Sequence, residues 1–207
     1  LCLVGSEMCI RDSILYKVNF PAEFHAQTAA EAAIKLHPQI AFDDIAHINI
    51  HTQEPGVRII SKQGPLTNYA DRDHCIEYIV AWCLLNGNLD ANSYTDEAAS
   101  DSRIDSLREI TSTSENTEYT NRYYNLDERA IPNKVTVTLK NGDVMEEEVI
   151  YPLGHRERRE ESKPYLKQKF NNSLQNTGLD QTFLSDAYNT LDLDKVEIYD
   201  ILKKIYK

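Results

Sequence analysis

The sequence predicts an α+β fold, and three observations support this class. The Ala-rich stretch Phe24–His37 has its apolar residues at helical spacing. The stretch Ile45–Thr52 alternates apolar and polar residues, which is typical of a half-buried strand. Lys134–Tyr151 also alternates and contains Asn141-Gly142, the strongest two-residue signal for a hairpin turn. Helices mixed with strands, one pair of them an antiparallel hairpin, indicate α+β.

The remaining elements follow from the same patterns in chain order. A short strand is expected over Ile14–Val18, and a loop over residues 53–68, which hold two prolines and two glycines. Asp71–Asn86 predicts a helix with one apolar stripe that ends at Gly87. The later segments predict two short helices over 90–108, a strand and a loop over 109–126, and helices over Lys163–Leu174 and Asp194–Tyr206.

Composition and charge exclude several classes of protein. The 207 residues are 41% hydrophobic and 27% charged, which excludes collagen-like, low-complexity and wholly disordered chains. The longest apolar runs fall short of the ~18 residues that cross a membrane, so no membrane partner is expected. The net charge of -11 argues against a nucleic-acid partner, which would select a basic face.

The first thirteen residues, LCLVGSEMCIRDS, do not read as part of the fold. The apolar run Leu1–Val4 lacks the preceding positive charge of a signal peptide, and the string resembles a translated sequencing adapter. We therefore expect residues 1–13 to be an artefact and the chain to be a fragment of a longer protein. Without them only Cys75 and Cys83 remain, outside any CxxC spacing, which favours a reducing, cytoplasmic location.

The first stretch that could form a functional site is the expected strand-to-helix turn near the start of the chain. It carries Lys17, Glu23, His25 and Gln27 within a few positions. Such turns commonly present polar groups to a ligand, and a helix N-terminus favours an anion. The alternative is that Glu23 and Gln27 cap the helix and that His25 is a surface residue.

The second stretch is Gly64–His74, followed by Tyr78. His74 and Tyr78 are four positions apart, so they would share one helix face at the core boundary. A tyrosine hydroxyl there could donate to a substrate or act as an acid. The alternative is an N-cap with a surface pair between Arg72 and an aspartate, and a tyrosine that packs at a domain edge.

The third stretch, Gly154–Arg159, is a basic segment in an acidic chain. Arginines ahead of a helix oppose its dipole, so either they lie far from the helix or anionic groups hold them; a solvated loop is the alternative. His47 and His51 would stand roughly 13 Å apart on a strand, so no metal site is expected. The sequence lacks GxSxG, HExxH and a Gly-rich phosphate loop, so pattern alone indicates only a small anion-handling domain.

Longer motifs carry a family resemblance. At YKVNFPAEFHAQTAAEAA and ISKQGPLTNYADRDHCIEYIVA the chain resembles the MmgE/PrpD family, and RIDSLRE, DERAIPN and EVIYPLGHRERR continue the match in order over residues 14–175. The resemblance implies an enzyme that dehydrates, epimerises or decarboxylates polycarboxylates without an iron–sulfur cluster, so no cofactor and no metal are expected. It implies a homodimer when the protein is full-length.

The resemblance also implies a domain organisation. Residues 14–155 would form the family's small α+β domain, and residues 156–207 would be C-terminal helices that pack on a larger all-helical domain. The active site would lie in the cleft between the two domains. Since the helical domain is missing from this sequence, we expect the 207-residue chain alone to be inactive.

The branch of the family is indicated by FPAEFHAQ and QGPLTNYADRDH. These motifs are similar to those of the lyases that remove water from the tricarboxylate 2-methylcitrate to give 2-methyl-cis-aconitate in propionate catabolism. Two alternatives stay open: another polycarboxylate enzyme of the family, of the cis-aconitate decarboxylase or iminodisuccinate epimerase type, or a non-catalytic interaction domain.

Removing water requires a base, an acid and cations that hold the carboxylates. The resemblance implies that Tyr78, which aligns with a family active-site tyrosine, is catalytic. Relatives place a histidine where this chain has Glu23 or Gln27, so His25 is the nearest substitute as a second catalytic residue. The expected substrate-binding residues are Lys17, Glu23, Arg72 and His155.

Overall fold

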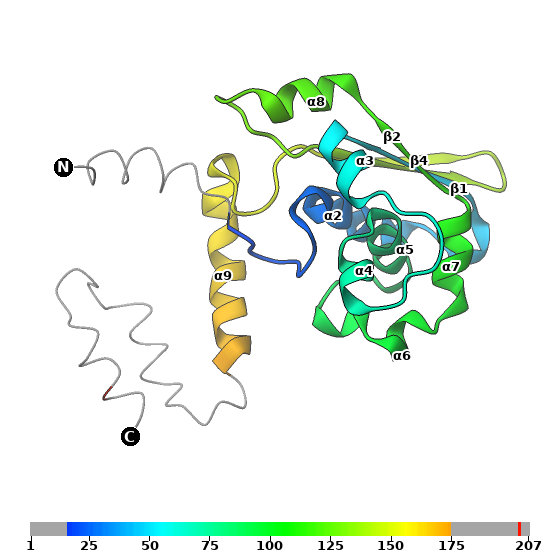
Figure 1. Ribbon diagram of the computed structural model, residues 1–207, viewed down its shortest axis with the longest axis horizontal. Helices are drawn as coiled ribbons and strands as arrows, with labels where there is room; N and C mark the ends of the chain where they lie inside the picture. The colour runs from blue at the N-terminus through cyan, green and yellow to red at the C-terminus, as the bar shows by residue number, and fades with distance from the viewer. Residues whose placement is uncertain (1–15, 175–202, 204–207) are drawn as a thin grey trace. The chain divides into compact units, whose positions relative to one another are not determined.

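A four-stranded mixed sheet organises the first of the chain's two compact units, residues 1–159. The computed structural model describes residues 16–174 and Lys203 (Figure 1). The strand order is β2-β1-β3-β4, with β1 parallel to β2, antiparallel to β3, and β3 antiparallel to β4. The α+β prediction is confirmed. The strands are β1 (Ile45–Thr52), β2 (Thr111–Glu115), β3 (Asn133–Leu139) and β4 (Val144–Val149).

The strand register separates an apolar face of the sheet from a polar one. Ile48 of β1 pairs with Val137 of β3, and Ile50 pairs with Val135, and all four side chains are fully buried. Neighbouring positions such as His51 point to the opposite face, because successive side chains on a strand alternate. The predicted strand at Ile45–Thr52 and the predicted hairpin are both confirmed.

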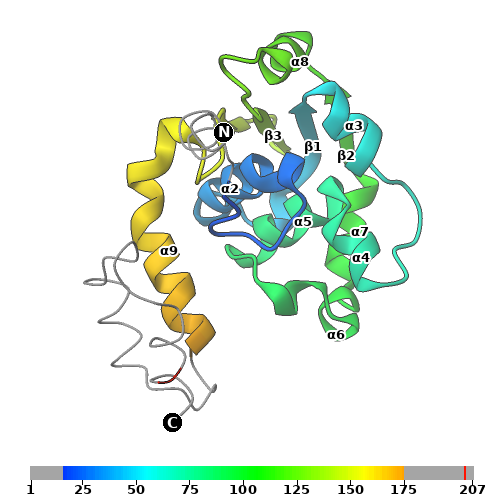
Figure 2. The ribbon, with the colours of Figure 1, turned by 60° about the vertical axis from the view of Figure 1, so that its left-hand side comes forward.

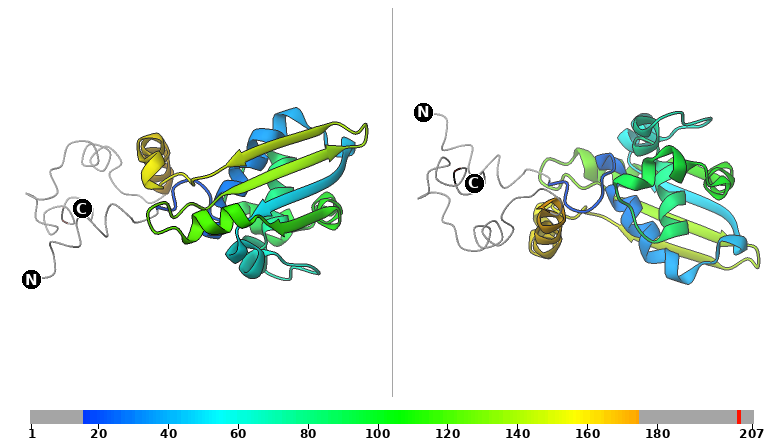
Figure 3. Two further views of the ribbon diagram at one scale, coloured as in Figure 1. Left: turned by 90° about the horizontal axis from the view of Figure 1, so that it is seen from above. Right: turned by 90° about the horizontal axis from the view of Figure 1, so that it is seen from below.

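Helices α2 (Gln27–Leu36) and α5 (Ile76–Asn86) cover the apolar face (Figure 3). Helix α2 packs on β3 and β4, and α5 lies beside α2 (Figure 2). The alanines that α2 buries have small side chains, which let the helix approach its neighbours closely; they are Ala29, Ala30, Ala32 and Ala33. Gly87 ends α5 as predicted, with φ of 67° and its N–H on the carbonyl of Cys83 at 2.9 Å.

The other helices in the described part of this unit are short and lie in the connections. They are α3 (Glu54–Ile60), α4 (Tyr69–Asp73), α6 (Asp96–Ala99), α7 (Ser102–Glu109) and α8 (Thr117–Tyr124). Among residues 16–174 the connections also hold 3-10 turns at Phe24–Ala26, His37–Gln39, Phe42–Asp44, Ala91–Tyr94 and Arg156–Arg158. Residues 90–108 thus hold a 3-10 turn and two α-helices rather than only two helices.

The prediction of a loop over residues 53–68 is wrong, since α3 occupies its first half. Pro55 stands in the first turn of α3, where the missing N–H has no helical partner to lose. Gly56 allows the helix to pack against β1, because a Cβ there would lie 2.5 Å from Oγ1 of Thr52. The proline and glycine therefore serve helix start and close packing instead of a turn.

The loop predicted after β2 is also wrong, because α8 forms there. The Asn116 side chain caps α8 by accepting from the N–H groups of Glu118 and Tyr119. The Oγ1 atom of Thr120 accepts from the backbone N–H of Glu54 at 2.9 Å, which ties α8 to α3. This helix is polar along the sequence and is stabilised by contacts that periodicity does not reveal.

The single helix predicted over Asp71–Asn86 is two helices, α4 and α5, with a break at His74 and Cys75. Cys75 is extended, with φ of -126° and ψ of 108°. The carbonyl of Asp73 accepts from the backbone N–H of Glu23 at 3.2 Å instead of continuing a helical ladder. Asp71 and Asp73 therefore belong to α4 and do not start α5.

The strand predicted over Ile14–Val18 is wrong for its described part, because residues 16–18 form no strand. Their course is set by Gly154, which has φ of +93°; a Cβ there would lie 2.4 Å from the carbonyl oxygen of Tyr16. Val18 is buried at this contact. Residues 14 and 15 lie outside the described residues.

The second compact unit, residues 160–207, is described through α9 (Arg159–Leu174), which starts at the boundary. This confirms the helix predicted over Lys163–Leu174, with an earlier start. The helix predicted over Asp194–Tyr206 lies outside the described residues apart from Lys203. Within the described residues, every helix is too short or too polar to cross a membrane.

Candidate active site

Glu23 and His25 form a carboxylate–imidazole pair at the turn before α2. The Nδ1 atom of His25 lies 2.8 and 2.9 Å from the two oxygens of Glu23, whose Oε2 also accepts from the His25 backbone N–H at 2.7 Å. The side chain of His25 is only 12% exposed, and that of Glu23 is 16% exposed. Burial acts to raise the pKa of Glu23, but the hydrogen bonds and charge of His25 outweigh it, and the pKa is lowered from 4.5.

Tyr123 completes this pair from the opposite side of the ring. Its hydroxyl lies 3.3 Å from Nε2 of His25, and the two rings are tilted by 40° at a centroid distance of 5.5 Å. Tyr123 belongs to α8, 98 positions away in the chain, and the sequence did not point to it. The signal that could have pointed to Tyr123 is a helical face rich in tyrosine. This signal was missed because the sequence pattern predicted a loop where α8 forms.

Lys17 lies in the same region, with its ammonium nitrogen 5.3 Å from the centroid of the Phe24 ring. Phe24 is the first residue of the 3-10 turn and stands between Glu23 and His25 in the chain, so Lys17 makes a cation–π contact with the turn that carries the pair. Of the residues predicted for the site, the structure thus brings Glu23 and His25 into direct contact and places Lys17 on the ring of the residue between them.

The capping alternative for this turn is partly correct. Glu23 is the N-cap of the 3-10 turn, as that alternative held. Gln27 is buried, and its Nε2 donates to the carbonyls of Phe20 and Ala22 at 2.9 and 2.8 Å, which holds the preceding segment in place. His25 is not an exposed surface residue, since its side chain is only 12% exposed, and both ring nitrogens have partners.

Tyr78 and Arg72 form a second cluster. Both side chains donate to backbone carbonyls of the 3-10 turn Ala91–Tyr94, which follows α5. The Tyr78 hydroxyl donates to the carbonyl of Ser93 at 2.8 Å, and the residue is 2% exposed. Arg72 donates to the carbonyl of Tyr94 at 2.7 Å and pairs with Asp96 at 2.8 Å. Burial raises the pKa of Tyr78 to about 12, so the phenol stays protonated.

The two clusters adjoin through one backbone hydrogen bond, from the N–H of Glu23 to the carbonyl of Asp73, the neighbour of Arg72. The predicted sharing of a helix face by His74 and Tyr78 is wrong, because His74 lies in the break between α4 and α5. Its side chain is 48% exposed and pairs with Asp73 at 2.5 Å.

His155 is buried at the start of the 3-10 turn Arg156–Arg158. Its Nε2 contacts the carbonyl of Glu128 at 3.1 Å, and its Nδ1 accepts from the N–H of Glu157 at 3.2 Å. The imidazole stacks on Tyr151 at 4.6 Å. Burial lowers the pKa of His155, which favours the neutral ring that this pattern of one donor and one acceptor requires.

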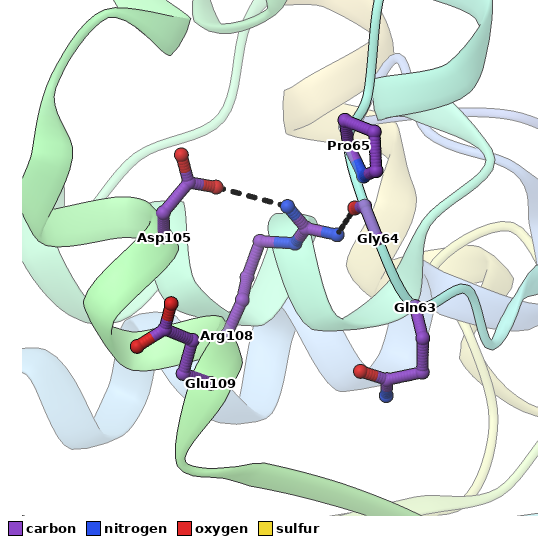
Figure 4. A pocket seen from close by; sticks show the side chains of 6 residues that line it. All are labelled: Gln63, Gly64, Pro65, Asp105, Arg108 and Glu109. Atoms are coloured by element: carbon purple, nitrogen blue, oxygen red, sulfur yellow. Dashed lines mark hydrogen bonds and ion pairs between the residues drawn. The ribbon is translucent and has the colours of Figure 1, made fainter.

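A depression of ≈ 250 Å³ lies apart from these residues, between the segment after α3 and helix α7 (Figure 4). Arg108 crosses it and donates to Asp105 at 2.9 Å and to the carbonyl of Gly64 at 2.8 Å. The lining holds two carboxylates, of Asp105 and Glu109, and one guanidinium that Asp105 already pairs with, so the depression suits an anionic substrate poorly. It is lined by Gln63, Gly64, Pro65, Asp105, Arg108 and Glu109.

The histidines of β1 are engaged with the neighbouring strand. The Nε2 of His47 lies 3.0 Å from Oγ of Ser112, and the Nδ1 of His51 lies 3.1 Å from Oγ of Ser114. Across the part of the chain that the structure describes, no three His, Cys, Asp or Glu side chains are grouped in a way that could hold a metal ion.

Comparison with known proteins decides the family. Residues 20–184 match the model of the MmgE/PrpD C-terminal domain. The chain belongs to the MmgE/PrpD family. This confirms the resemblance, and the MmgE/PrpD match includes Glu23, His25, Arg72, Tyr78, Tyr123 and His155.

Three curated relatives that the chain resembles are named 2-methylcitrate dehydratase. The chain is 53% identical to the mitochondrial 2-methylcitrate dehydratase of Yarrowia lipolytica over 78% of this chain and 32% of that protein. It is 48% identical to the 2-methylcitrate dehydratase of Cupriavidus necator and 45% identical to that of Escherichia coli (strain K12), in each case over 80% of this chain and 35% of the relative. The chain therefore spans about a third of the length of the curated relatives it matches.

Proposed function

We propose that this chain is part of a 2-methylcitrate dehydratase, a hydro-lyase that eliminates water from 2-methylcitrate to give 2-methyl-cis-aconitate in propionate catabolism without an iron–sulfur cluster. The observation that carries the proposal is 45–53% identity to relatives with that name. The Glu23–His25 pair supports it, because an oriented imidazole is a suitable base for this reaction.

The elimination takes a proton from one carbon and a hydroxyl group from the next. In the proposal, Nε2 of His25 takes the proton and Tyr78 gives one to the departing hydroxyl, which leaves as water. A pKa of about 12 makes Tyr78 an acid rather than a base at neutral pH. Donation to substrate requires the Tyr78 hydroxyl to exchange the Ser93 carbonyl for the leaving oxygen.

The cations Lys17 and Arg72 are the proposed ligands of the substrate carboxylates. Lys17 lies over the ring of Phe24, which stands between Glu23 and His25 in the chain. Arg72 precedes Asp73, whose carbonyl accepts from the backbone N–H of Glu23. Glu23 and His155 belong to the proposed substrate site as supporting groups. The Glu23 carboxylate faces His25, and His155 holds the backbone of Glu128.

A chimera tests the activity. Residues 20–184 would replace the matching segment of the Cupriavidus necator relative, and turnover of 2-methylcitrate would be followed by the ultraviolet absorbance of the new conjugated double bond. We expect turnover, and we expect His25→Gln in the chimera to lower kcat by about 10² to 10⁴. The unmodified relative is the positive control, and circular dichroism shows whether each chimera is folded.

Two results would overturn the proposed function. One is a folded chimera without turnover of 2-methylcitrate. The other is release of carbon dioxide from cis-aconitate by the chimera but not by the unmodified relative, which would assign a decarboxylase instead. A chimera with His25→Gln as active as the parent chimera would remove His25 as the base.

The proposal extends to the domain organisation, the compartment and the assembly of the full-length protein. Residues 14–155 are proposed as the α+β domain and 156–207 as helices that pack on an all-helical domain, in a homodimer; the family resemblance supports both. A reducing, cytoplasmic location is supported by Cys75 and Cys83, which are free and buried. Light scattering of the chimera and fractionation of source cells test these points, since the Yarrowia lipolytica relative is named mitochondrial.

A further inference from the structure

The imidazole of His25 has a polar partner on each ring nitrogen, one from its own turn and one 98 positions away in the chain. Glu23 contacts Nδ1 with both carboxylate oxygens at 2.8 and 2.9 Å, from the same turn. Tyr123 contacts Nε2 at 3.3 Å, from α8. The ring is therefore held between a local and a distant group.

The chemistry of Glu23 determines which nitrogen carries the proton. An ionised carboxylate only accepts hydrogen bonds, so the Nδ1 atom must be the donor. The lowered pKa of Glu23 keeps its carboxylate ionised at neutral pH. In the neutral imidazole the lone pair is then on Nε2, which accepts from the Tyr123 hydroxyl.

The backbone of His25 is fixed as firmly as its ring. Its N–H donates to Glu23 at 2.7 Å, and its carbonyl accepts from Nδ2 of Asn133 on β3 at 2.7 Å. Asn133 is fully buried and also donates to Oγ1 of Thr28 at 2.6 Å. The sheet thus sets the position of the imidazole through Asn133.

Tyr123 is presented by a helix that is held on two sides. The Tyr119 hydroxyl bonds to the Glu148 carboxylate on β4, and Thr120 accepts from the N–H of Glu54 at the start of α3. Tyr124 packs edge-on against Tyr123 at 5.1 Å. The Tyr123 hydroxyl therefore contacts His25 from a helix whose position is held by hydrogen bonds to β4 and α3.

We propose that Glu23 and Tyr123 are positioning residues that hold His25 in the tautomer with the proton on Nδ1 and the basic lone pair on Nε2. For Nε2 to take a proton, the Tyr123 O–H first turns away from the Nε2 lone pair. Nδ1 then keeps its own proton, Glu23 stays ionised beside the imidazolium, and the Tyr123 oxygen can accept from the new Nε2–H. The tautomer stands on geometry alone, whereas the use of Nε2 as the base in dehydration rests on the proposed function.

Nitrogen NMR of the 15N-labelled 207-residue chain tests the tautomer without substrate. Spectra are taken at about pH 8, where histidines of ordinary pKa are neutral. Two histidines serve as internal references: Nδ1 of His37 faces the Leu84 carbonyl at 2.8 Å, and Nε2 of His155 faces the Glu128 carbonyl. We expect His25 to show the pattern of His37, and His25→Gln to remove that signal.

Paired variants test the role of Tyr123. Tyr123→Phe keeps the ring and removes the donor, so the Nε2 resonance of His25 should move towards that of an unbonded nitrogen. The matched control is Tyr124→Phe, whose hydroxyl contacts Glu54 at 3.1 Å; it should leave the resonance in place. In the chimera, Tyr123→Phe should lower kcat about 10-fold with KM unchanged, and Tyr124→Phe should change neither.

The outcomes separate this inference from the proposed function. A proton on Nε2 of His25, or an Nε2 resonance that Tyr123→Phe leaves in place, would overturn the inference. An equal shift from Tyr124→Phe would overturn it as well. The expected NMR pattern together with an inactive parent chimera would support the inference and reject the proposed function.

Discussion

Arg158 and Glu31, which lie 127 positions apart in the chain, form a two-bonded ion pair with distances of 2.8 and 2.9 Å. The side chains are only 16% and 12% exposed, and Arg158 also donates to the carbonyl of Tyr151 at 2.7 Å. An anionic group therefore holds this arginine of the basic stretch, which was one of the two explanations for its position ahead of a helix. The pair fastens the end of the first unit to α2.

We expect Arg158→Ala to lower the free energy of unfolding by about 2–3 kcal/mol, because it leaves the shielded Glu31 carboxylate without its main partner. Urea denaturation of the 207-residue chain measures the change. Arg156→Ala is the control, since Arg156 is exposed and contacts Glu157 only at 3.5 Å. Equal effects of the two substitutions would contradict a special role of the pair.

Glu77 is a buried carboxylate that sequence reasoning passed over. It accepts from Oγ of Ser61 at 2.6 Å, from the N–H of Lys62 at 3.1 Å and from Oγ1 of Thr113 at 2.7 Å. Glu77→Gln puts an amide donor against these donors, so we expect a loss of about 2 kcal/mol or more in urea denaturation. The control is Glu109→Gln, which should leave the unfolding midpoint unchanged because Glu109 is exposed. If Glu77→Gln also left the midpoint at the wild-type value, the hydrogen bonds of Glu77 would contribute little to stability.

Gly142 and Gly154 have the same φ of +93° but different surroundings, so substituting each by alanine distinguishes the cost of backbone strain from the cost of a steric clash. At Gly142 a Cβ would meet nothing within 4 Å, whereas at Gly154 it would lie 2.4 Å from the Tyr16 carbonyl oxygen. Gly142→Ala should cost about 1–2 kcal/mol from the left-handed backbone alone. Gly154→Ala should cost a further ~1–3 kcal/mol for the steric conflict. Thermal unfolding of both variants checks this, and equal losses would show that the Tyr16 contact yields at no cost.

The lowered pKa of Glu23 predicts a pH dependence of stability. A carboxyl whose folded-state pKa lies below its unfolded value stabilises the fold above about pH 4.5, and this contribution is lost as the pH falls through the folded-state pKa. The difference in unfolding free energy between wild type and Glu23→Gln should therefore shrink from about pH 6 to about pH 3. Other carboxyls are common to both proteins and cancel, so a constant difference would show that Glu23 gains nothing from ionisation.

Tyr78→Phe should lower turnover of 2-methylcitrate in the chimera by about 10-fold or more, if its phenol donates the proton to the leaving group. The loss of its hydrogen bond to Ser93 should cost only about 1 kcal/mol of stability, so the protein should remain folded. Tyr69→Phe is the control, because Tyr69 is 42% exposed. Undiminished kcat in Tyr78→Phe would remove Tyr78 from the mechanism.

Several parts of the fold could be predicted because their signals are local. Each of these signals depends on residues close together in the chain. They are the alternation of Ile48 and Ile50 with polar neighbours, the Asn141-Gly142 turn and the alanines of α2. Helices α3 and α8 could not be predicted in this way. Pro55 reads as a loop residue until its place in the first turn is known, and the N-terminus of α3 is bonded to Thr120, 66 positions away.

The candidate site shows the same division. The sequence and its family resemblance selected Lys17, Glu23 and His25, which lie close together in the chain; Glu23 contacts His25 directly, and Lys17 contacts Phe24 between them. Tyr123 was missed because it meets His25 only when α8 folds over the turn.

By itself the sequence determined the α+β class, the main strands and helices, and the membership of the MmgE/PrpD family, since periodicity, turn residues and long motifs are properties of contiguous residues. The tertiary structure decided which side chains act together. It separated α4 from α5, turned Tyr78 into the core, and set Glu23 and Tyr123 on the two nitrogens of His25. The physical reason is that hydrogen bonds and burial depend on distance in space: Ser93 lies 15 positions from Tyr78 and Tyr123 lies 98 positions from His25.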